Sequence, residues 1–410
     1  MISIAEARRR LETVLFRKGT ERVELAAAQG RVLAVDLHAD LDMPPFDKAC
    51  MDGYAARATE LSTGDATLAV GETITAGAVP MREVRPGEVA RIMTGSPMPA
   101  GADCVVMVER SRPADVPGRV RLTDTPVSGQ HVQRRGELFR AGDVVLPAGT
   151  LARGPELAVM ATIGAVRPLV FERPRVALVA TGDELVDAAS LPGPGQIRDS
   201  NRYALEALVT EHGGAWLGAT RARDDQGALA AAFEAALARA DVLLVSGGVS
   251  AGDLDLVEPV LVSLGFEILF DSVALKPGQP AVLARRGNQL AFGLPGNPVS
   301  GLVVLSLFGV PALRYLAGRR ADALDLPRLA ARIAHPVRAK ALNRAQYLPA
   351  RVTIEAGELV VVETPWHGSS DMRGVTRANA YLVIETDTAP PAVGTRGLVL
   401  LWRDPFEGAV

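Results

Sequence analysis

The chain is poor in the residues on which several classes of protein depend. It has two cysteines, Cys50 and Cys104, which form no Cys-X-X-Cys pair, so neither a disulfide framework nor a cysteine-based zinc site is indicated and both read as small buried residues. Aromatic residues make up 4% of the sequence, which argues against the base-stacking surfaces of proteins that bind single strands. The net charge is −3, whereas nucleic-acid-binding domains usually carry a basic excess. We therefore expect no nucleic-acid partner.

The sequence also lacks a clear targeting or membrane-spanning segment. Its first residues carry no apolar signal-peptide core, and Ser3 and Glu6 instead predict a helix that begins with a capping box. The longest apolar run, at residues 301–313, is interrupted by serine, glycine and proline, so we expect it to be too short to cross a bilayer. The prediction is a cytoplasmic globular protein without a membrane partner.

The middle of the chain alternates apolar strands with helices. Strands are expected at 175–180, 216–220, 242–245 and 266–270, followed by a hairpin of 281–284 and 290–292. Helices are expected from a cap at 199–201 through 212, at 229–240, at 254–264 and after Asn297, where a proline suits the first turn. This order predicts a mostly parallel sheet with helices on both faces, whose ligands bind at the carboxyl ends of the strands.

The segments on either side have a different pattern. Residues 39–146 are rich in glycine and proline with short apolar runs, which predicts a separate β-rich domain. After Pro327 the pattern becomes short alternating strands at 348–354, 359–363, 380–385 and 397–402, typical of a small β-barrel or sandwich. The fold class is therefore a multidomain α/β protein: an α/β sheet domain between a β-rich N-terminal domain and a small C-terminal β-domain.

Two glycine-rich loops follow strands of the predicted sheet. Residues 241–253 run from a buried strand into Ser246-Gly-Gly-Val-Ser250, and residues 294–301 form a glycine turn that opens an apolar helix. Free backbone amides at such a helix start suit an anion, although a plain chain connection would use the same glycine and proline. Together, the two loops favour a phosphate-bearing ligand and an enzyme of nucleotide or cofactor chemistry.

Acidic residues gather at the same edge. They are Asp183, Glu184, Asp224 and the acids of Gly252-Asp-Leu-Asp255. Each by itself is explained as well by a turn or a helix N-cap. All of them at one sheet edge favour Mg²⁺ held by carboxylates together with phosphates. Lys276, on a stiff Lys-Pro-Gly-Gln-Pro turn, is either a cation for a phosphate or oxyanion or a solvated loop lysine.

At this point the residues resemble a known family, the molybdopterin molybdenumtransferases of the MoeA and gephyrin E-domain type. The matching motifs occur in the family's order and cover most of the chain. They are Met51-Asp-Gly-Tyr-Ala55, Met93-Thr-Gly-Ser-Pro97 with Gly101-Ala-Asp103, Thr181-Gly-Asp-Glu-Leu185, Asp199-Ser-Asn201, Ser246-Gly-Gly-Val-Ser250 with Gly252-Asp253, Lys276-Pro-Gly278 and Leu294-Pro-Gly-Asn-Pro-Val-Ser300. The two N-terminal motifs are ordinary turn chemistry when taken alone.

The resemblance implies a protomer in four parts. Residues 1–40 with 140–172 would form an N-terminal helix and linker domain, 41–139 the β-rich domain, 173–322 the molybdopterin-binding domain and 323–410 the C-terminal barrel. It also implies a homodimer with each active site between subunits, so that Asp52 and Thr94 would enter the partner's site. Small-molecule substrates, and other proteins of cofactor biosynthesis, would be the remaining partners.

The implied reaction inserts molybdate into adenylylated molybdopterin with Mg²⁺ and releases AMP. The catalytic residues carried over from the family are Asp52, Thr94, Glu184, Asp224, Asp255 and Lys276, with Glu184, Asp224 and Asp255 as the metal ligands. The cofactor-binding residues would be Gly182, Asp183, Ser200, Asn201, Ser246, Gly247, Gly248, Ser250, Gly252, Pro295, Gly296, Asn297 and Pro298.

The chain departs from the family pattern in three places. Lys48-Ala49 replaces an Asn-Ser pair, Leu138 stands where an acid is usual, and Gln279 stands at a commonly basic position. These departures leave two alternatives open: a non-catalytic molybdopterin-binding carrier or scaffold, and a tungstate-specific paralogue.

Overall fold

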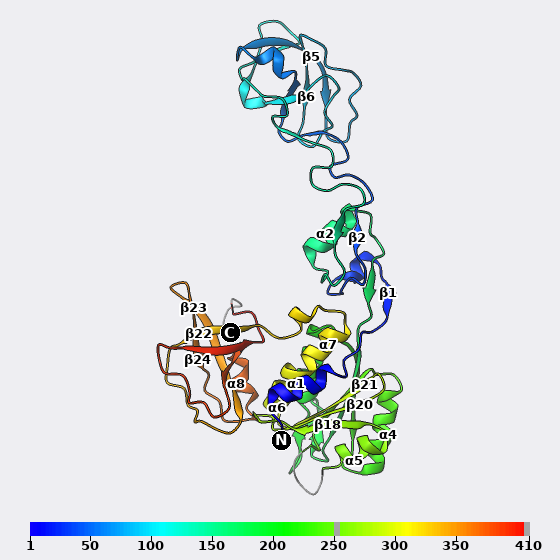
Figure 1. Cartoon of the computed structure of the whole chain (residues 1–410), viewed down its shortest axis with the longest axis vertical. Coiled ribbons are helices and arrows are strands. Elements are labelled where there is room, and N and C mark those ends of the chain that lie inside the picture. Colours follow the sequence, from blue (N-terminus) through cyan, green and yellow to red (C-terminus); the bar gives the residue numbers. More distant parts are fainter. Residues whose placement is uncertain (250–254, 406–410) are drawn as a thin grey trace. The chain divides into compact units, whose positions relative to one another are not determined.

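The computed structural model describes residues 1–249 and 255–405 (Figure 1). The chain divides into two compact units. The large unit comprises Met1–Ala34, Gly149–Arg153 and Leu169–Val410, and the small unit comprises Val35–Ala148 and Gly154–Pro168. The four-part division of the chain stays a prediction.

The small unit is β-rich, as predicted. Its sheet has the strand order β7-β4-β6-β5-β9-β8, and residues that alternate along β4 and β7 bury both of its faces: Tyr54 and Val106 belong to one apolar cluster, Ala55 and Val105 to the other. Cys104 is buried in this sheet, but Cys50 is exposed, so the prediction that both cysteines are buried was wrong for Cys50. The elements of the small unit are β2 (Leu37–His38), β3 (Lys48–Ala49), β4 (Gly53–Ala56), β5 (Ala66–Ile74), β6 (Glu88–Ile92), β7 (Cys104–Met107), β8 (Ser111–Pro113), β9 (Arg119–Leu122), β10 (Val132–Gln133), β11 (Val144–Leu146) and α2 (Gly154–Thr162).

A six-stranded sheet organises the large unit, in the order β16-β13-β17-β21-β20-β18. β16, β13, β17 and β21 are parallel, and β20 is antiparallel to both of its neighbours, so the predicted parallel sheet and its hairpin are confirmed. The strands are β13 (Arg175–Thr181), β16 (Ala215–Ala222), β17 (Val242–Ser246), β18 (Glu267–Ser272), β20 (Pro280–Arg286) and β21 (Gln289–Leu294). Smaller pairs are β1 (Thr20–Arg22) with β12 (Leu169–Phe171), and β14 (Leu185–Val186) with β15 (Ile197–Arg198).

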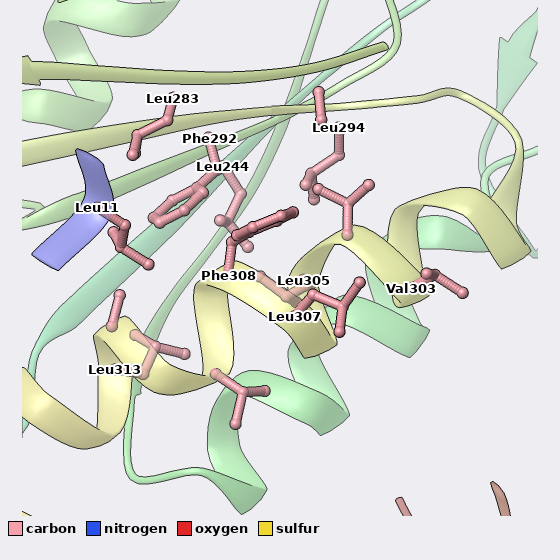
Figure 2. Close-up of a cluster of buried hydrophobic side chains, with 14 of the residues drawn as sticks. Leu11, Leu244, Leu283, Phe292, Leu294, Val303, Leu305, Leu307, Phe308 and Leu313 are labelled. Carbon is pink, nitrogen blue, oxygen red and sulfur yellow. The ribbon is translucent and has the colours of Figure 1, made fainter. Parts of the chain in front are cut away.

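Helices cover both faces of this sheet because alternate strand residues are apolar on each side. Leu244 belongs to the apolar cluster that includes residues of α1, α3, α6 and α7, whereas Leu243 and Val245 belong to the cluster that includes residues of α4 and α5. Figure 1 shows α4 and α5 on one side of the sheet and α1, α6 and α7 on the other. Figure 2 shows the first of these cores, in which Phe308 lies beside Phe292 and Leu244. The helices are α1 (Ile4–Glu12), α3 (Asn201–Glu211), α4 (Gln226–Leu237), α5 (Val257–Ser263), α6 (Pro298–Val304) and α7 (Val310–Leu316).

Two of the predicted helix caps, Ser3 and Asp225, are confirmed, whereas the Glu6 carboxylate binds Arg9 and Arg10 instead of closing a capping box. The Ser3 hydroxyl accepts a hydrogen bond from the Glu6 amide at 3.1 Å, and Asp225 accepts one from the Ala228 amide at 2.9 Å. Both side chains satisfy amides that the first helical turn leaves without a partner. Asn297 precedes α6 without such a bond.

Residues Pro298–Leu316 form one continuous helical run in which a π-helical turn, Leu305–Gly309, joins α6 to α7. By length and composition this run could cross a membrane, which corrects our expectation that it would be too short. However, 83% of the most apolar 18-residue stretch of this run is buried inside the protein. Burial of this kind is that of a core helix, and Pro311 in the run accounts for the local change from regular α-helical bonding because it offers no backbone N–H.

The C-terminal part of the large unit is a closed five-stranded barrel. Its ring is closed because β23 pairs with both β24 and β25, and β22 and β26 complete the circuit. A short strand of the sheet region, β19 (Leu275–Lys276), pairs in parallel with β23 and so ties the barrel to the loop that carries Lys276. The barrel elements are β22 (Arg328–Ile333), β23 (Ala345–Glu355), β24 (Glu358–Glu363), α8 (Met372–Thr376), β25 (Ala380–Ile384) and β26 (Arg396–Leu401). The predicted fold class is thereby confirmed, with a barrel rather than a sandwich at the C-terminus.

Candidate active site

A cavity of about 960 Å³ opens at the carboxyl edge of the parallel strands. Its walls come from the loops after β13, β17 and β21, the β19 turn and two segments of the C-terminal barrel. This is the edge at which open α/β sheets bind ligands. The volume is that of a site for a nucleotide-sized molecule.

Glycines allow three strand ends to meet at the floor of the cavity. Gly247 has φ +94°, and a Cβ atom there would lie 2.5 Å from the carbonyl oxygen of Thr181. A Cβ on Gly296 would lie 3.7 Å from the Cα of Gly247. The loops after β17 and β21 therefore present backbone, rather than side chains, to the cavity. The Gly247 amide itself donates to the Leu294 carbonyl oxygen at 3.0 Å, so a phosphate would have to bind the neighbouring amides of these loops.

Gly247→Ala is expected to destabilise the large unit by about 2 kcal/mol, because the new Cβ meets backbone and the positive φ is strained for alanine. Urea unfolding followed by tryptophan fluorescence measures this directly, since Trp216, Trp366 and Trp402 all lie in the large unit.

The control for Gly247→Ala is Gly227→Ala in α4. The nearest atom to a Cβ at Gly227 is the helix-capping Oδ1 of Asp225, at 3.3 Å, a slightly tight side-chain contact rather than a clash with backbone. Alanine in this helix should be neutral or stabilising by up to about 1 kcal/mol. Equal losses in the two variants would contradict the strain argument.

The side chain of Asn201 links two loops at the floor of the cavity. Its Nδ2 donates to the Ser246 hydroxyl and to the Gly296 carbonyl oxygen, each at 2.8 Å. One side chain at the start of α3 therefore links the end of β17 to the loop after β21. In this structure Asn201 acts on the shape of the site.

Glu184, Asp224 and Asp255 all line the cavity. The Thr181 hydroxyl donates to Asp224, and Asp255 accepts from the Val257 amide at 3.3 Å. Burial raises the pKa of Asp255, and the Val257 amide opposes this effect. A partly buried carboxylate whose charge is disfavoured would gain from a cation nearby.

Across residues 1–249 and 255–405, no three His, Cys, Asp or Glu side chains are grouped closely enough to hold a metal ion by themselves. The chemistry of the three carboxylates still fits Mg²⁺, because this ion usually takes one or two carboxylates and completes its shell with substrate phosphates and water. The assignment of these residues as metal ligands stays a prediction.

Two cations line another part of the cavity, Lys276 on β19 and Arg344 just before β23. Arg344 Nη1 donates to the side-chain amide oxygen Oε1 of Gln279. Because this acceptor is neutral, it orients the guanidinium without cancelling its charge. The cavity therefore combines carboxylates, backbone amides and cations, as a site for a phosphorylated ligand with a divalent ion would require.

The barrel residues of the cavity were missed by the sequence reasoning, which looked for ligands only at the sheet edge. They are Arg344, Trp366, Gly368 and Ser369. Their arrival depends on the pairing of β19 with β23, a contact between segments about 70 residues apart for which the sequence holds no local signal.

Models of protein families match nearly the whole chain. The MoeA N-terminal region (domains I and II) matches residues 2–164, a probable molybdopterin-binding domain matches 177–315, and the MoeA C-terminal region (domain IV) matches 331–402. The chain belongs to the MoeA family. The family named from the sequence motifs is thereby confirmed.

Curated relatives support the same family assignment. A molybdopterin molybdenumtransferase of Nostoc sp. is 41% identical over 306 residues, which are 73% of this chain and 70% of the relative. One of Haemophilus influenzae is 32% identical over 397 residues, 96% and 97% of the two chains. A crystal structure of a MoeA protein from Pyrococcus horikoshii superposes with a TM-score of 0.81 at 29% identity, covering 98% of this chain and all of that one. This MoeA-family chain is thus a transferase of molybdenum cofactor biosynthesis, as the motifs predicted.

Most of the predicted cofactor-binding residues that the structure describes line the cavity. Asp183 does not: it is exposed, 3.9 Å from Arg223. Ser200 and Pro298 stand at helix starts beside lining residues without lining the cavity themselves. Ser250 and Gly252 lie outside the described residues. The residues that do line it are Gly182, Asn201, Ser246, Gly247, Gly248, Pro295, Gly296 and Asn297.

The two predicted catalytic residues of the small unit form a pair. The amide and the hydroxyl of Thr94 both donate to one carboxylate oxygen of Asp52, each at 2.7 Å. The Thr94 hydroxyl, then its amide, lower the pKa of Asp52. Asp52 is therefore a fixed, ionised carboxylate at neutral pH, and its entry into a partner's site stays a prediction.

Proposed function

We propose that this chain catalyses the Mg²⁺-dependent insertion of molybdate into adenylylated molybdopterin with release of AMP. Support comes from one cavity that brings together backbone-amide loops, three carboxylates and two cations, in a chain whose relatives are molybdopterin molybdenumtransferases. Water cleaves the phosphoanhydride between the molybdopterin phosphate and AMP, which releases AMP. The two dithiolene sulfurs bond to molybdenum, and the molybdate oxygens that they displace leave as water with the thiol protons and protons from solvent, so that no oxidant or reductant is needed.

Residues of different charge would bind different parts of the ligand. The amides around Gly247 and Gly296 would hold phosphate oxygens, and Lys276 and Arg344 would hold further anionic groups such as a phosphate or molybdate. Glu184, Asp224 and Asp255 would hold Mg²⁺, with the Thr181 hydroxyl fixing the orientation of Asp224. When bound, Mg²⁺ would neutralise phosphate charge and polarise the phosphoanhydride.

A homodimer belongs to the same proposal. Asp52, held by Thr94 on the small unit, is exposed in the single chain. No function for this fixed surface carboxylate is evident within the single chain. A role in the partner's active site would explain why it is held in place. Cytoplasmic location and contacts with other proteins of cofactor biosynthesis stay predictions.

The first experiment is to incubate the purified protein with adenylylated molybdopterin and Mg²⁺ and to measure AMP with and without molybdate. We expect AMP release that requires Mg²⁺ and is stimulated by molybdate. A parallel reaction with tungstate tests the paralogue alternative, which predicts stronger stimulation by tungstate. Tight molybdopterin binding with no AMP release under either oxyanion would replace the transferase with a carrier.

A further inference from the structure

We propose that Trp366 is a stacking platform for a flat heteroaromatic ring of the substrate, supplied by the C-terminal barrel. The inference rests on the proposed function, because adenylylated molybdopterin carries two such rings, the pterin and the adenine. It assigns ring recognition to a residue outside the sheet and its glycine loops.

Trp366 stands out chemically among the residues of the cavity. It is the one aromatic side chain among the described residues that line it. The glycine loops at the floor bind polar groups, and the apolar residues that also line the cavity are aliphatic or proline, such as Ile197, Val249 and Leu275, none of which has a planar ring face. Stacking on an aromatic side chain is a common way in which proteins hold a purine or a similar ring. Tryptophan provides the largest such face with only two rotatable side-chain bonds.

The backbone that follows Trp366 is fixed by one carboxylate. Asp371 accepts from the His367 amide at 2.9 Å and from the Gly374 amide at 3.0 Å. A Cβ on Gly374 would lie 2.6 Å from the Cβ of Trp366, so the glycine lets α8 pack directly against the tryptophan. The indole is also half-buried and packs against the barrel's apolar cluster.

The same loop is anchored to the floor of the cavity. The Ser369 carbonyl oxygen accepts from the Val299 amide at 3.0 Å, in the first turn of the helix that follows the Gly296 loop. Trp366 is therefore held relative to the proposed phosphate-binding amides before any ligand arrives. A platform that is already ordered costs a ligand little conformational entropy.

Charge complements this arrangement. Arg344, also from the barrel, lines the cavity with its guanidinium on a neutral acceptor, and Lys276 lies on the adjoining strand. A ligand that joins a ring to a phosphate would place the ring on Trp366 and the phosphate among the cations and amides. Both halves of such a ligand therefore find partners in one cavity.

Fluorescence can test the contact directly. The chain has three tryptophans, so the double variant Trp216→Phe/Trp402→Phe leaves Trp366 as the sole tryptophan. We would titrate this variant with AMP, with a 6-substituted pterin monophosphate and with ribose 5-phosphate, which has no aromatic ring. Quenching by AMP alone or by the pterin alone supports the proposal and identifies the ring. Absence of quenching by both ring-bearing ligands overturns it.

Binding to otherwise unaltered protein gives a second test. Trp366→Leu keeps an apolar side chain against the barrel but removes the ring face, so Kd for the quenching ligand should rise about tenfold, equal to about 1.4 kcal/mol. Trp366→Phe should restore binding to within about threefold of the native chain, and Kd for ribose 5-phosphate should not change in either variant. An unchanged Kd in Trp366→Leu, or equal weakening of both ligands, contradicts stacking.

The two tests of Trp366 can fail or succeed independently of the proposed transferase reaction. Molybdate-stimulated AMP release by the native chain, together with unaltered binding in Trp366→Leu, removes the stacking role and leaves the transferase. Stacking without AMP release retains Trp366 as a ring-binding residue and removes the reaction.

Discussion

Asp255→Asn and Asp224→Asn are each expected to lower the rate of molybdate-stimulated AMP release by about 100- to 1,000-fold, the usual cost of losing one fixed electrostatic partner in an active site. Both carboxylates line the cavity, and both variants keep the shape of the side chain. The amides and cations that would hold the ligand are untouched, so Kd for AMP in the absence of Mg²⁺ should change by less than about threefold.

Asp225→Asn provides a matched control beside Asp224. Asp225 caps α4 by accepting from the Ala228 amide at 2.9 Å, and it does not line the cavity. Asparagine caps a helix about as well as aspartate, so stability and AMP release should both stay near the native values. If Asp224→Asn were as active as Asp225→Asn, Asp224 would have no place in the metal site.

Raising the Mg²⁺ concentration extends the test. Loss of one carboxylate ligand weakens metal binding, so the remaining activity of Asp255→Asn should need more Mg²⁺ for half-maximal AMP release than the native chain does. A native Mg²⁺ dependence with a low maximal rate would instead place Asp255 in contact with the reacting groups rather than with the metal.

The parts of the fold that the sequence predicts are those governed by local pattern. Buried parallel strands such as β17 have continuous apolar sequences because both faces are covered, and the caps at Ser3 and Asp225 mark helix starts directly. The start of α5 was predicted about three residues early, at 254 rather than Val257. Capping residues there are ambiguous because the preceding sequence, Gly252-Asp-Leu-Asp255, offers two acids.

What the sequence could not provide is the meeting of distant segments. Lys276 was a candidate from its turn, but its neighbour Arg344 comes from the barrel, and the β19–β23 pairing that joins them has no pattern of its own. The same holds for Trp366, whose segment looks like an ordinary loop until Asp371 and Val299 fix it at the cavity. Asp52 and Thr94 were named only from the family resemblance, because two turn residues 42 positions apart give no sign of their hydrogen bonds.

The largest expected effect on stability comes from Asp241, at the start of β17. The residue is 7% exposed, and its carboxylate accepts from Lys18 Nζ at 2.9 Å and from the Arg175 amide at 2.7 Å. It thereby ties the segment after α1 to two central strands. Asp241→Asn leaves the Lys18 ammonium without its nearest counter-ion, and removal of one partner from such a pair should lower the free energy of unfolding of the large unit by about 3 kcal/mol.

The control for Asp241→Asn is Asp322→Asn. Asp322 pairs with Arg320 at 3.4 Å, but both side chains are more than half exposed. An exposed pair of this kind contributes at most about 1 kcal/mol. Urea unfolding followed by tryptophan fluorescence measures both variants, and similar losses would show that burial of the Asp241 pair adds nothing.

The stabilisation of the fold by Asp241 should decrease at low pH. Burial by itself raises the pKa of Asp241, but hydrogen bonds from Arg175 and Lys18 outweigh burial and the pKa is lowered below its usual 3.8. A carboxyl group with a lowered pKa in the folded state stabilises the fold fully above its unfolded pKa, and this stabilisation is lost as the pH falls through the folded value. The difference in stability between the native chain and Asp241→Asn should therefore be constant from about pH 5 to 7 and shrink below about pH 4. A difference that persists undiminished at low pH would mean that the variant loses packing rather than an ion pair.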